Sequence, residues 1–326
     1  FGIAEELLRL TVRNGLEGEL PELWFRNASV EQRKNGPRFM VRYNPQICAL
    51  ELERLLLENG VRIVYGTSVC DVIKEGPRIS AVIAENKSGR SAIEAECVVD
   101  CTGDADICHM AGAPTALFPD KNPMAAWYYY LQNGQLHLNS LGACDVTDEE
   151  EDPAVLQRIG GSDRVSGVDA WENSRFLQAA HAEMLRDILA RRGRGEDCVP
   201  VTMATIPQLR MTRRLEGESC VCARDDHRRR ETSVGLFSDW TRRGPAFELP
   251  FDTLYHASVP NLLTAGRCIS AADDLWNATR VIPVCAVSGE AAGTAAALGC
   301  DFPSLDIAVL QRKLRSQGVR VHLDEL

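Results

Sequence analysis

The sequence lacks the residue spacings that mark a metal site. Its 326 residues include twelve cysteines, which are scattered, form no CxxC pair and do not cluster with the six histidines. We therefore predict no metal site. Many of the cysteines stand in apolar runs, where a free thiol behaves as a small hydrophobic group. This usage predicts a reducing compartment, the cytoplasm.

Long apolar runs and an excess of basic charge are also missing. The longest apolar stretch, Val281 to Leu298, is interrupted by Ser288 and Glu290, so it predicts a helix of a folded core rather than a membrane span. The net charge of −10 disfavours nonspecific binding to nucleic acid, because phosphates require a basic face. We expect neither nucleic acid nor a membrane as partner. A composition of 45% hydrophobic and 25% charged residues excludes overall disorder.

Capping residues and apolar periodicity predict the main helices. Asn44 as N-cap and Pro45 in the first turn predict a helix that ends at Gly60. Other helices are predicted over residues 3–13, 168–192, 284–298 and 306–317.

Residues 61–96 have the alternating pattern of an antiparallel β-meander. Strands are predicted over residues 61–65 and 68–73, followed by a hairpin of residues 78–84 and 91–95.

Two junctions, about 160 residues apart, carry most of the chemical information. The apolar strand Cys97–Asp100 runs into Thr102-Gly103-Asp104, and the strand Asn261–Thr264 runs into Gly266-Arg267. Small residues let a backbone approach a ligand closely, and a helix N-terminus presents free N–H groups and partial positive charge. The alternative for either junction alone is ordinary packing of a helix on a sheet.

Four segments together resemble the FAD-dependent oxidoreductases with a glutathione-reductase-like flavin fold. The resemblance covers nearly the whole chain and is carried by VVDCTGDAD (98–106), RMTRRLEG (210–217), NLLTAGRCISA (261–271) and RVIPVCAVSGEAAGTAA (280–296). It implies an α/β fold: an FAD/NAD(P)-binding, Rossmann-type domain with an antiparallel β-meander and an α+β insertion domain. The implied domains are a flavin-binding domain formed by residues 1–115 and 251–326 and a substrate or cap domain over residues 116–250.

The resemblance also implies roles in binding FAD. The turn after the first strand would lie against the cofactor, the turn after the second by the pyrophosphate and ribityl chain, and the start of the last alanine-rich helix would face the flavin ring. The implied cofactor-binding residues are Val69, Cys70, Thr102, Gly103, Asp104, Gly266, Arg267, Arg280, Pro283 and Gly289.

On the substrate side, Arg210, Arg213 and Arg214 could bind an anionic small molecule, since a guanidinium fork matches a carboxylate. The alternative is that these arginines are surface residues or form ion pairs, for which Asp225 and Asp226 are the suggested partners.

Two departures from the family pattern affect the expected chemistry. The strand, GxGxxG turn and helix with which the family opens are absent, so we expect a fragment that lacks its N-terminal βαβ unit. Asp273 stands where many relatives have a histidine. If that histidine takes part in their chemistry, this protein is expected to handle protons differently or to use another substrate. The catalytic candidates are Arg210, Arg213 and Asp273.

The expected function is FAD-dependent oxidoreduction, in which a hydride passes between a small-molecule substrate and the flavin, and an unknown acceptor reoxidises the flavin. The alternative is a truncated, non-catalytic remnant or binding domain that keeps the scaffold but does not hold FAD. An NAD-only dehydrogenase is disfavoured because no dinucleotide fingerprint is present.

Overall fold

The computed structural model describes all residues except 21, 26–27, 38 and 143–163. The helices are α1 (Gly2–Gly15), α2 (Glu22–Phe25), α3 (Val30–Asn35), α4 (Pro45–Glu58), α5 (Asp106–Met110), α7 (Ala170–Gly193), α8 (Asp273–Thr279), α9 (Ile282–Leu298) and α10 (Ile307–Ser316). The strands are β1 (Ser68–Glu75), β2 (Arg78–Asn86), β3 (Gly89–Glu94), β4 (Val98–Asp100), β5 (Thr115–Leu117), β6 (Ala125–Gln132), β7 (Gln135–Gly142), β8 (Val199–Pro200), β9 (Arg213–Leu215), β10 (Ser233–Ser238), β11 (Ala246–Pro250) and β12 (Leu262–Thr264). The fold is mixed α/β.

Side-chain caps start the helices where the sequence predicts them. The Asn44 Oδ1 accepts hydrogen bonds from the backbone N–H groups of residues 46 and 47, both at 3.1 Å, and so caps α4. Asp169 caps α7 and Asp306 caps α10 in the same way. Each cap satisfies N–H groups that the first helical turn leaves without an intrahelical acceptor, which stabilises a helix by about 1 kcal/mol. The helices predicted at these positions are confirmed.

The predicted β-meander begins later than the sequence suggests. β1, β2 and β3 form an antiparallel sheet in that order, and Asn86 pairs with Gly89 at the predicted hairpin. The strand predicted over residues 61–65 is wrong, because these residues pair with no strand in the described part of the chain. Val64 and Tyr65 are 61% and 70% exposed, so water takes the place of a neighbouring strand.

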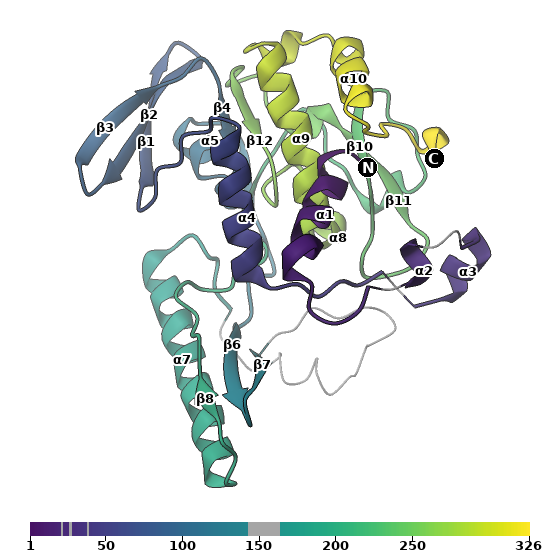
Figure 1. The fold of residues 1–326 in the computed structure, drawn as a ribbon. Helices are drawn as coiled ribbons and strands as arrows, with labels where there is room; N and C mark the ends of the chain where they lie inside the picture. The colour runs from purple at the N-terminus through teal and green to yellow at the C-terminus, as the bar shows by residue number, and fades with distance from the viewer. Residues whose placement is uncertain (21, 26–27, 38, 143–163) are drawn as a thin grey trace.

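A short parallel pair connects the beginning and the end of the chain. β4 pairs with β12 in parallel, with Val98 opposite Leu262 and Asp100 opposite Thr264. α9 lies beside this pair, and α1 lies along α9 (Figure 1). The backbone N–H of Ile3 donates to Glu290 of α9 at 2.9 Å, which ties α1 to that helix. The main hydrophobic core includes residues of β10, β11, α8, α9 and α10.

The sheet β7-β6-β8 and helix α7 form a unit that extends from the rest of the structure (Figure 1). Tyr128 and Tyr130 point from β6 into a small core with Ala180 and Met184 of α7. Trp127, on the opposite face of β6, is 50% exposed. This unit belongs to the segment expected as an insertion. The domain boundaries proposed for the chain stay a prediction.

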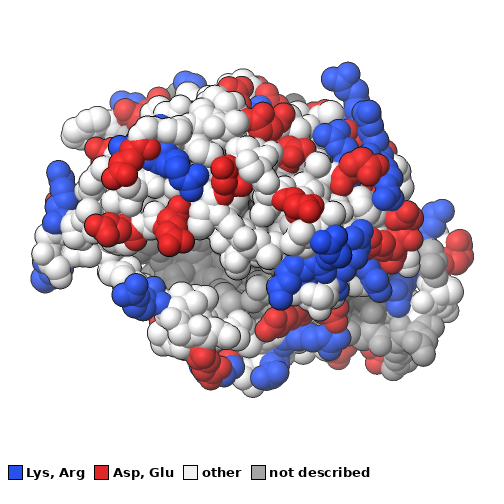
Figure 2. Space-filling model, turned by 90° about the horizontal axis from the view of Figure 1, so that it is seen from above, with Lys and Arg blue, Asp and Glu red and all other residues white. Residues whose placement is uncertain are grey.

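Charges of both signs are interspersed on the face of the molecule that Figure 2 shows. Among the described helices, none is by itself long and apolar enough to cross a membrane. Only the pair α8 and α9, which is bent by 88° at the break between the helices, meets the length and composition of a span when taken together.

Candidate functional site

The two predicted junctions lie together at one edge of the parallel pair. Because β4 and β12 run in the same direction, the turns that follow them leave the sheet on the same side. The N–H of Ala265 donates to the Asp100 carbonyl at 3.0 Å and brings the two turns into register. Carboxyl ends of parallel strands are the usual place for ligand-binding turns in α/β folds.

The side chain of Asp100 fixes the first turn by hydrogen bonds. Its side chain is fully buried, and its Oδ1 accepts from the N–H of Thr102 at 3.0 Å and from the Thr102 hydroxyl at 2.7 Å. The other oxygen accepts from the N–H of Cys108 in α5 at 3.0 Å. A buried carboxylate is stable only when its oxygens are satisfied in this way. Sequence reasoning did not select Asp100, although an Asp two residues before a turn hydroxyl is the pattern of a local side-chain-to-backbone bond.

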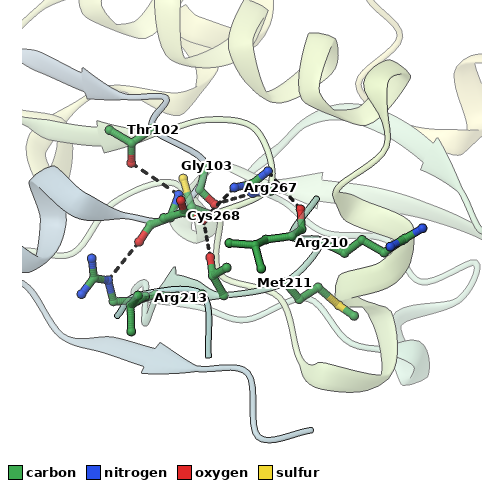
Figure 3. Close-up of polar contacts among 12 residues, drawn as sticks. Thr102, Gly103, Arg210, Met211, Arg213, Arg267 and Cys268 are labelled. Atoms are coloured by element: carbon green, nitrogen blue, oxygen red, sulfur yellow. Dashed lines mark hydrogen bonds and ion pairs between the residues drawn. The ribbon is translucent and has the colours of Figure 1, made fainter. Parts of the chain in front are cut away.

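Arg267 bridges the two turns, as Figure 3 shows. Its Nε donates to the Gly103 carbonyl at 2.8 Å, and a terminal nitrogen donates to the Asp104 carboxylate at 2.7 Å. The Thr212 hydroxyl donates to the same carboxylate oxygen. The structure therefore brings together Gly103, Asp104 and Arg267, which the sequence assigned to one cofactor site, and adds Thr212, which it had not selected.

Two glycines give these turns a backbone conformation that other residues adopt only under strain. Gly103 has φ +81° and Gly266 has φ +86°. A Cβ at Gly103 would lie 2.9 Å from the Nε of Arg267, so any side chain there would displace the bridge. At Gly266 the nearest atom to such a Cβ is the Cys285 sulfur at 3.9 Å, so there the left-handed φ is the constraint.

The start of α9 is the third part of the site. Pro283 lies in its first turn, no side chain caps it, and Ile282 is 68% exposed. The Arg280 Nε donates to the Asn277 Oδ1 at 2.9 Å, which holds its guanidinium against the end of α8. A helix end of this kind offers N–H groups and partial positive charge to an anion.

Gly289 lies one to two turns into α9. A Cβ built at Gly289 would meet no atom within 4 Å of its position. No described residue therefore packs closely against this glycine, and its place in a cofactor site stays a prediction.

Val69 and Cys70 of β1 lie differently with respect to the first turn. Val69 packs against the core cluster that contains Ala105 and Ile107, the residues that follow that turn in the chain. Cys70 is exposed, and its sulfur lies 3.6 Å from the Ile83 carbonyl across the meander. The place of these two residues in a cofactor site stays a prediction.

The three arginines of residues 210–214 lie in three different environments. Arg213 donates to the Asp104 carbonyl at 2.9 Å and pairs with Asp106, so it supports the turn rather than facing a ligand. Arg210 is held by its backbone N–H on Asn122, and its side chain points away from the turn in Figure 3. Arg214 lies 3.8 Å from the third catalytic candidate, Asp273.

The ion-pair partners suggested for these arginines are wrong. Asp225 pairs with Arg230 at 3.1 Å and with Arg228, and Asp226 contacts His227 at 2.7 Å. The latter is a histidine–carboxylate pair that the spacing did not indicate.

A second histidine–carboxylate pair was also missed. His322 Nδ1 lies 2.9 Å from the Glu248 carboxylate, and both side chains are buried. Because 74 residues separate them, no local spacing could have shown the pair. It fixes the segment after α10 to β11.

Burial changes the ionisation of groups around the turns. It raises the pKa of the Asp106 carboxyl, helped by the charge of Asp104 and opposed by Arg213. Burial also raises the pKa of the thiols of Cys101, Cys268 and Cys285. These thiols therefore stay protonated near neutral pH and line the turns as small, weakly polar groups.

The family described as FAD dependent oxidoreductase matches residues 1–124 and 167–314, which is most of the chain. The fold and site define a mixed α/β protein with paired strand–turn junctions, and the chain belongs to the FAD-dependent oxidoreductase family. The cofactor that the family indicates is FAD. No curated protein matches the chain.

Solved structures that resemble the chain include flavin-dependent enzymes. A geranylgeranyl bacteriochlorophyll reductase-like protein from Thermoplasma acidophilum is 12% identical with a TM-score of 0.42, and the match covers 88% of this chain and 62% of that one. MibH, a lathipeptide tryptophan 5-halogenase, is 13% identical with a TM-score of 0.39, with 96% and 48% covered. The chain thus spans less than two thirds of the length of either protein.

The described residues fit FAD. The turns present left-handed glycine backbone where a planar or phosphorylated group must come close, and the uncapped start of α9 is exposed. Arg267 supplies a positive charge between the turns. If FAD binds as the family predicts, these groups would contact its pyrophosphate and flavin ring.

Proposed function

We propose that the chain holds FAD for an oxidoreductase acting on a small, anionic molecule. The observation that carries the proposal is the bridge by which Arg267 joins Gly103 and Asp104 to the turn after β12. The bridge holds the two glycine turns next to each other, and the Gly266 N–H, which donates to the Ser288 hydroxyl at 2.9 Å, ties the second turn to α9. When bound, FAD would exchange a hydride with the substrate, and an acceptor of unknown identity would reoxidise it.

The residues of the chain would act mainly by position and charge. Gly266 would allow close approach of the pyrophosphate, and the first turn of α9 would place positive potential beside the flavin ring. Arg280, held by Asn277, would add a positive charge at the same helix start. Such a charge favours an anionic, reduced ring and so raises its tendency to accept a hydride.

The roles of Arg210, Arg213 and Asp273 in catalysis are weaker proposals. Arg213 is occupied by Asp104 and Asp106, which argues for a supporting role in the turn. Asp273 is half-exposed at the start of α8, 3.8 Å from Arg214. We expect the protein in the cytoplasm, without a nucleic-acid or membrane partner.

The experiment is a measurement of flavin content and midpoint potential in Arg280→Gln and Gly266→Ala. We expect lower FAD content in Gly266→Ala and a more negative potential in Arg280→Gln, because each variant removes a feature that faces the cofactor. Arg90→Lys, an exposed pair partner of Glu85, is the control and should match the unmodified chain. Unchanged content and potential in both test variants would reject the assignment. Absence of FAD in the unmodified chain would instead support the non-catalytic alternative, which the family match does not favour.

A further inference from the structure

Arg214 is buried beside an aromatic ring. It lies on β9 opposite Ala116 of β5, and its side chain is only 13% exposed. Its guanidinium carbon is 5.5 Å from the ring centroid of Trp276, which is itself fully buried. Phe118 packs edge-on against the same ring at 5.6 Å. Phe118 therefore holds in place the Trp276 ring that lies against the guanidinium.

The hydrogen-bonding groups of Arg214 are poorly satisfied. Its Nε is buried and has no hydrogen-bond partner. Within the described part of the chain, the oppositely charged group next to it is the carboxylate of Asp273 at 3.8 Å, which is beyond hydrogen-bonding distance. Asp273 is 49% exposed and so is free to remain solvated.

The neighbouring residue on β9 shows what a satisfied arginine looks like here. Arg213 is 12% exposed, nearly the same as Arg214, yet it donates to the Asp104 carbonyl and forms an ion pair with Asp106. Burial of a guanidinium is costly unless its charge and its donors are met. The two arginines are buried to nearly the same extent, but Arg213 has partners for its charge and its N–H donors, whereas the Nε of Arg214 has no hydrogen-bond partner. This difference indicates that a ligand supplies the missing partner of Arg214.

We propose that Arg214 binds the carboxylate group of a small-molecule ligand. A guanidinium presents two parallel N–H donors that match a carboxylate, while the Trp276 ring holds its plane. Asp273 and Asp274 stand exposed at the start of α8, and their negative charges disfavour a dianionic phosphate more than a monoanionic carboxylate. That this ligand is the substrate rests on the proposed function. The binding itself requires no flavin.

The test is a titration of the purified chain, labelled with ¹⁵N-arginine, with sodium acetate, sodium succinate and sodium sulfate at matched ionic strength. NMR follows the arginine Nε–H signals, and Arg214→Lys identifies the signal of Arg214 by its loss. We expect both carboxylates to shift this signal saturably. Isothermal titration calorimetry measures the affinity in every chain, because the variants lack this signal. The affinity for both carboxylates should fall by at least about 10-fold in Arg214→Gln and in Arg214→Lys, since both lose the charged fork.

Arg228→Gln is the matched control. Arg228 also stands 3.8 Å from an aspartate, Asp225, but is 66% exposed, so its replacement should leave carboxylate affinity unchanged. The proposal is overturned if acetate and succinate leave the Arg214 signal unmoved, or if Arg214→Gln binds them as well as the control does. Binding of sulfate in preference to both carboxylates overturns the carboxylate assignment.

The outcome is separable from that of the proposed function. If Arg214→Gln does not fold, the titration of the unmodified chain and of Arg214→Lys still decides the question. A chain that binds carboxylate at Arg214 but no FAD would reject the proposed function and keep this inference.

Discussion

The turns after β4 and β12 lie at the same edge of one parallel pair, yet they are held in different ways. The first turn is fixed by carboxylates. Asp100 accepts hydrogen bonds from Thr102 and Cys108, and Asp104 accepts a hydrogen bond from the Arg267 guanidinium. The second is fixed by backbone geometry. Gly266 has a left-handed φ, and its N–H donates to the Ser288 hydroxyl at 2.9 Å. Both turns contain a left-handed glycine, but the first turn depends in addition on buried carboxylates, which the second turn lacks.

The replacement Asp100→Ala is expected to have the largest effect. It removes the acceptors of three hydrogen bonds and leaves the N–H of Cys108 buried without a partner. The free energy of unfolding should fall by about 3 kcal/mol, as measured by urea denaturation. Asp197→Ala, at an exposed position, should change it by less than about 0.5 kcal/mol. Equal midpoints for the two variants would show that the carboxylate does not hold the first turn.

The replacement Arg267→Lys removes the bridge between the turns but keeps the charge. A lysine cannot donate to Gly103 and Asp104 at once in the geometry of the guanidinium, so we expect a loss of about 2 kcal/mol in unfolding free energy. Arg90→Lys is the control, because Arg90 also contacts a carboxylate at 2.7 Å but is exposed. Its effect should be near zero. If the bridge does not stabilise the fold, the unfolding free energy will change by the same small amount in both variants.

Two glycine-to-alanine changes separate backbone strain from open space. Gly266→Ala should destabilise the chain by about 1 kcal/mol because φ is +86°. Gly289→Ala should stabilise it by up to about 1 kcal/mol, since alanine favours a helix and its Cβ meets nothing within 4 Å. Thermal unfolding gives both values. If Gly289 contacts FAD as predicted, Gly289→Ala should also lower FAD affinity, opposite in sign to its effect on stability.

The smallest expected effect is the pH dependence that Asp106 gives to the first turn. Burial and the charge of Asp104 raise the pKa of Asp106, so the folded chain binds this proton more tightly than the unfolded chain. The contribution of this group to stability is fully present below its ordinary pKa of about 4 and is lost as the pH rises through the raised value. Unfolding free energies measured across this range should decline less in Asp106→Asn. If the unfolding free energy has the same slope against pH in both chains, Asp106 is not a cause of the pH dependence.

The local parts of this fold could be predicted from the sequence, because their causes are local. Asn44 and Pro45 start α4, and the hairpin closes between Asn86 and Gly89. The segment 61–65 shows the limit of such reasoning: its apolar alternation favours a strand, but a strand also requires a neighbour with free backbone groups. A neighbouring strand must come from another part of the chain, so the residues of the segment alone could not show that it is missing.

The candidate site required more than local pattern. The resemblance grouped Gly103, Asp104 and Arg267, and the structure places them in contact. Asp100 and Thr212 were not selected, because their role depends on hydrogen bonds formed only after folding. For the same reason, three arginines within five residues looked alike in the sequence, although only Arg214 lacks a hydrogen-bond partner at its buried Nε.

The most direct test of the central claim is a titration of the purified chain with FAD, followed by flavin fluorescence. The account predicts saturable quenching at one FAD per chain, with weaker binding in Gly266→Ala and Arg267→Lys and unchanged binding in Arg90→Lys. FAD that stays fully fluorescent and separates from the chain on gel filtration would contradict the claim that the two turns form a flavin site.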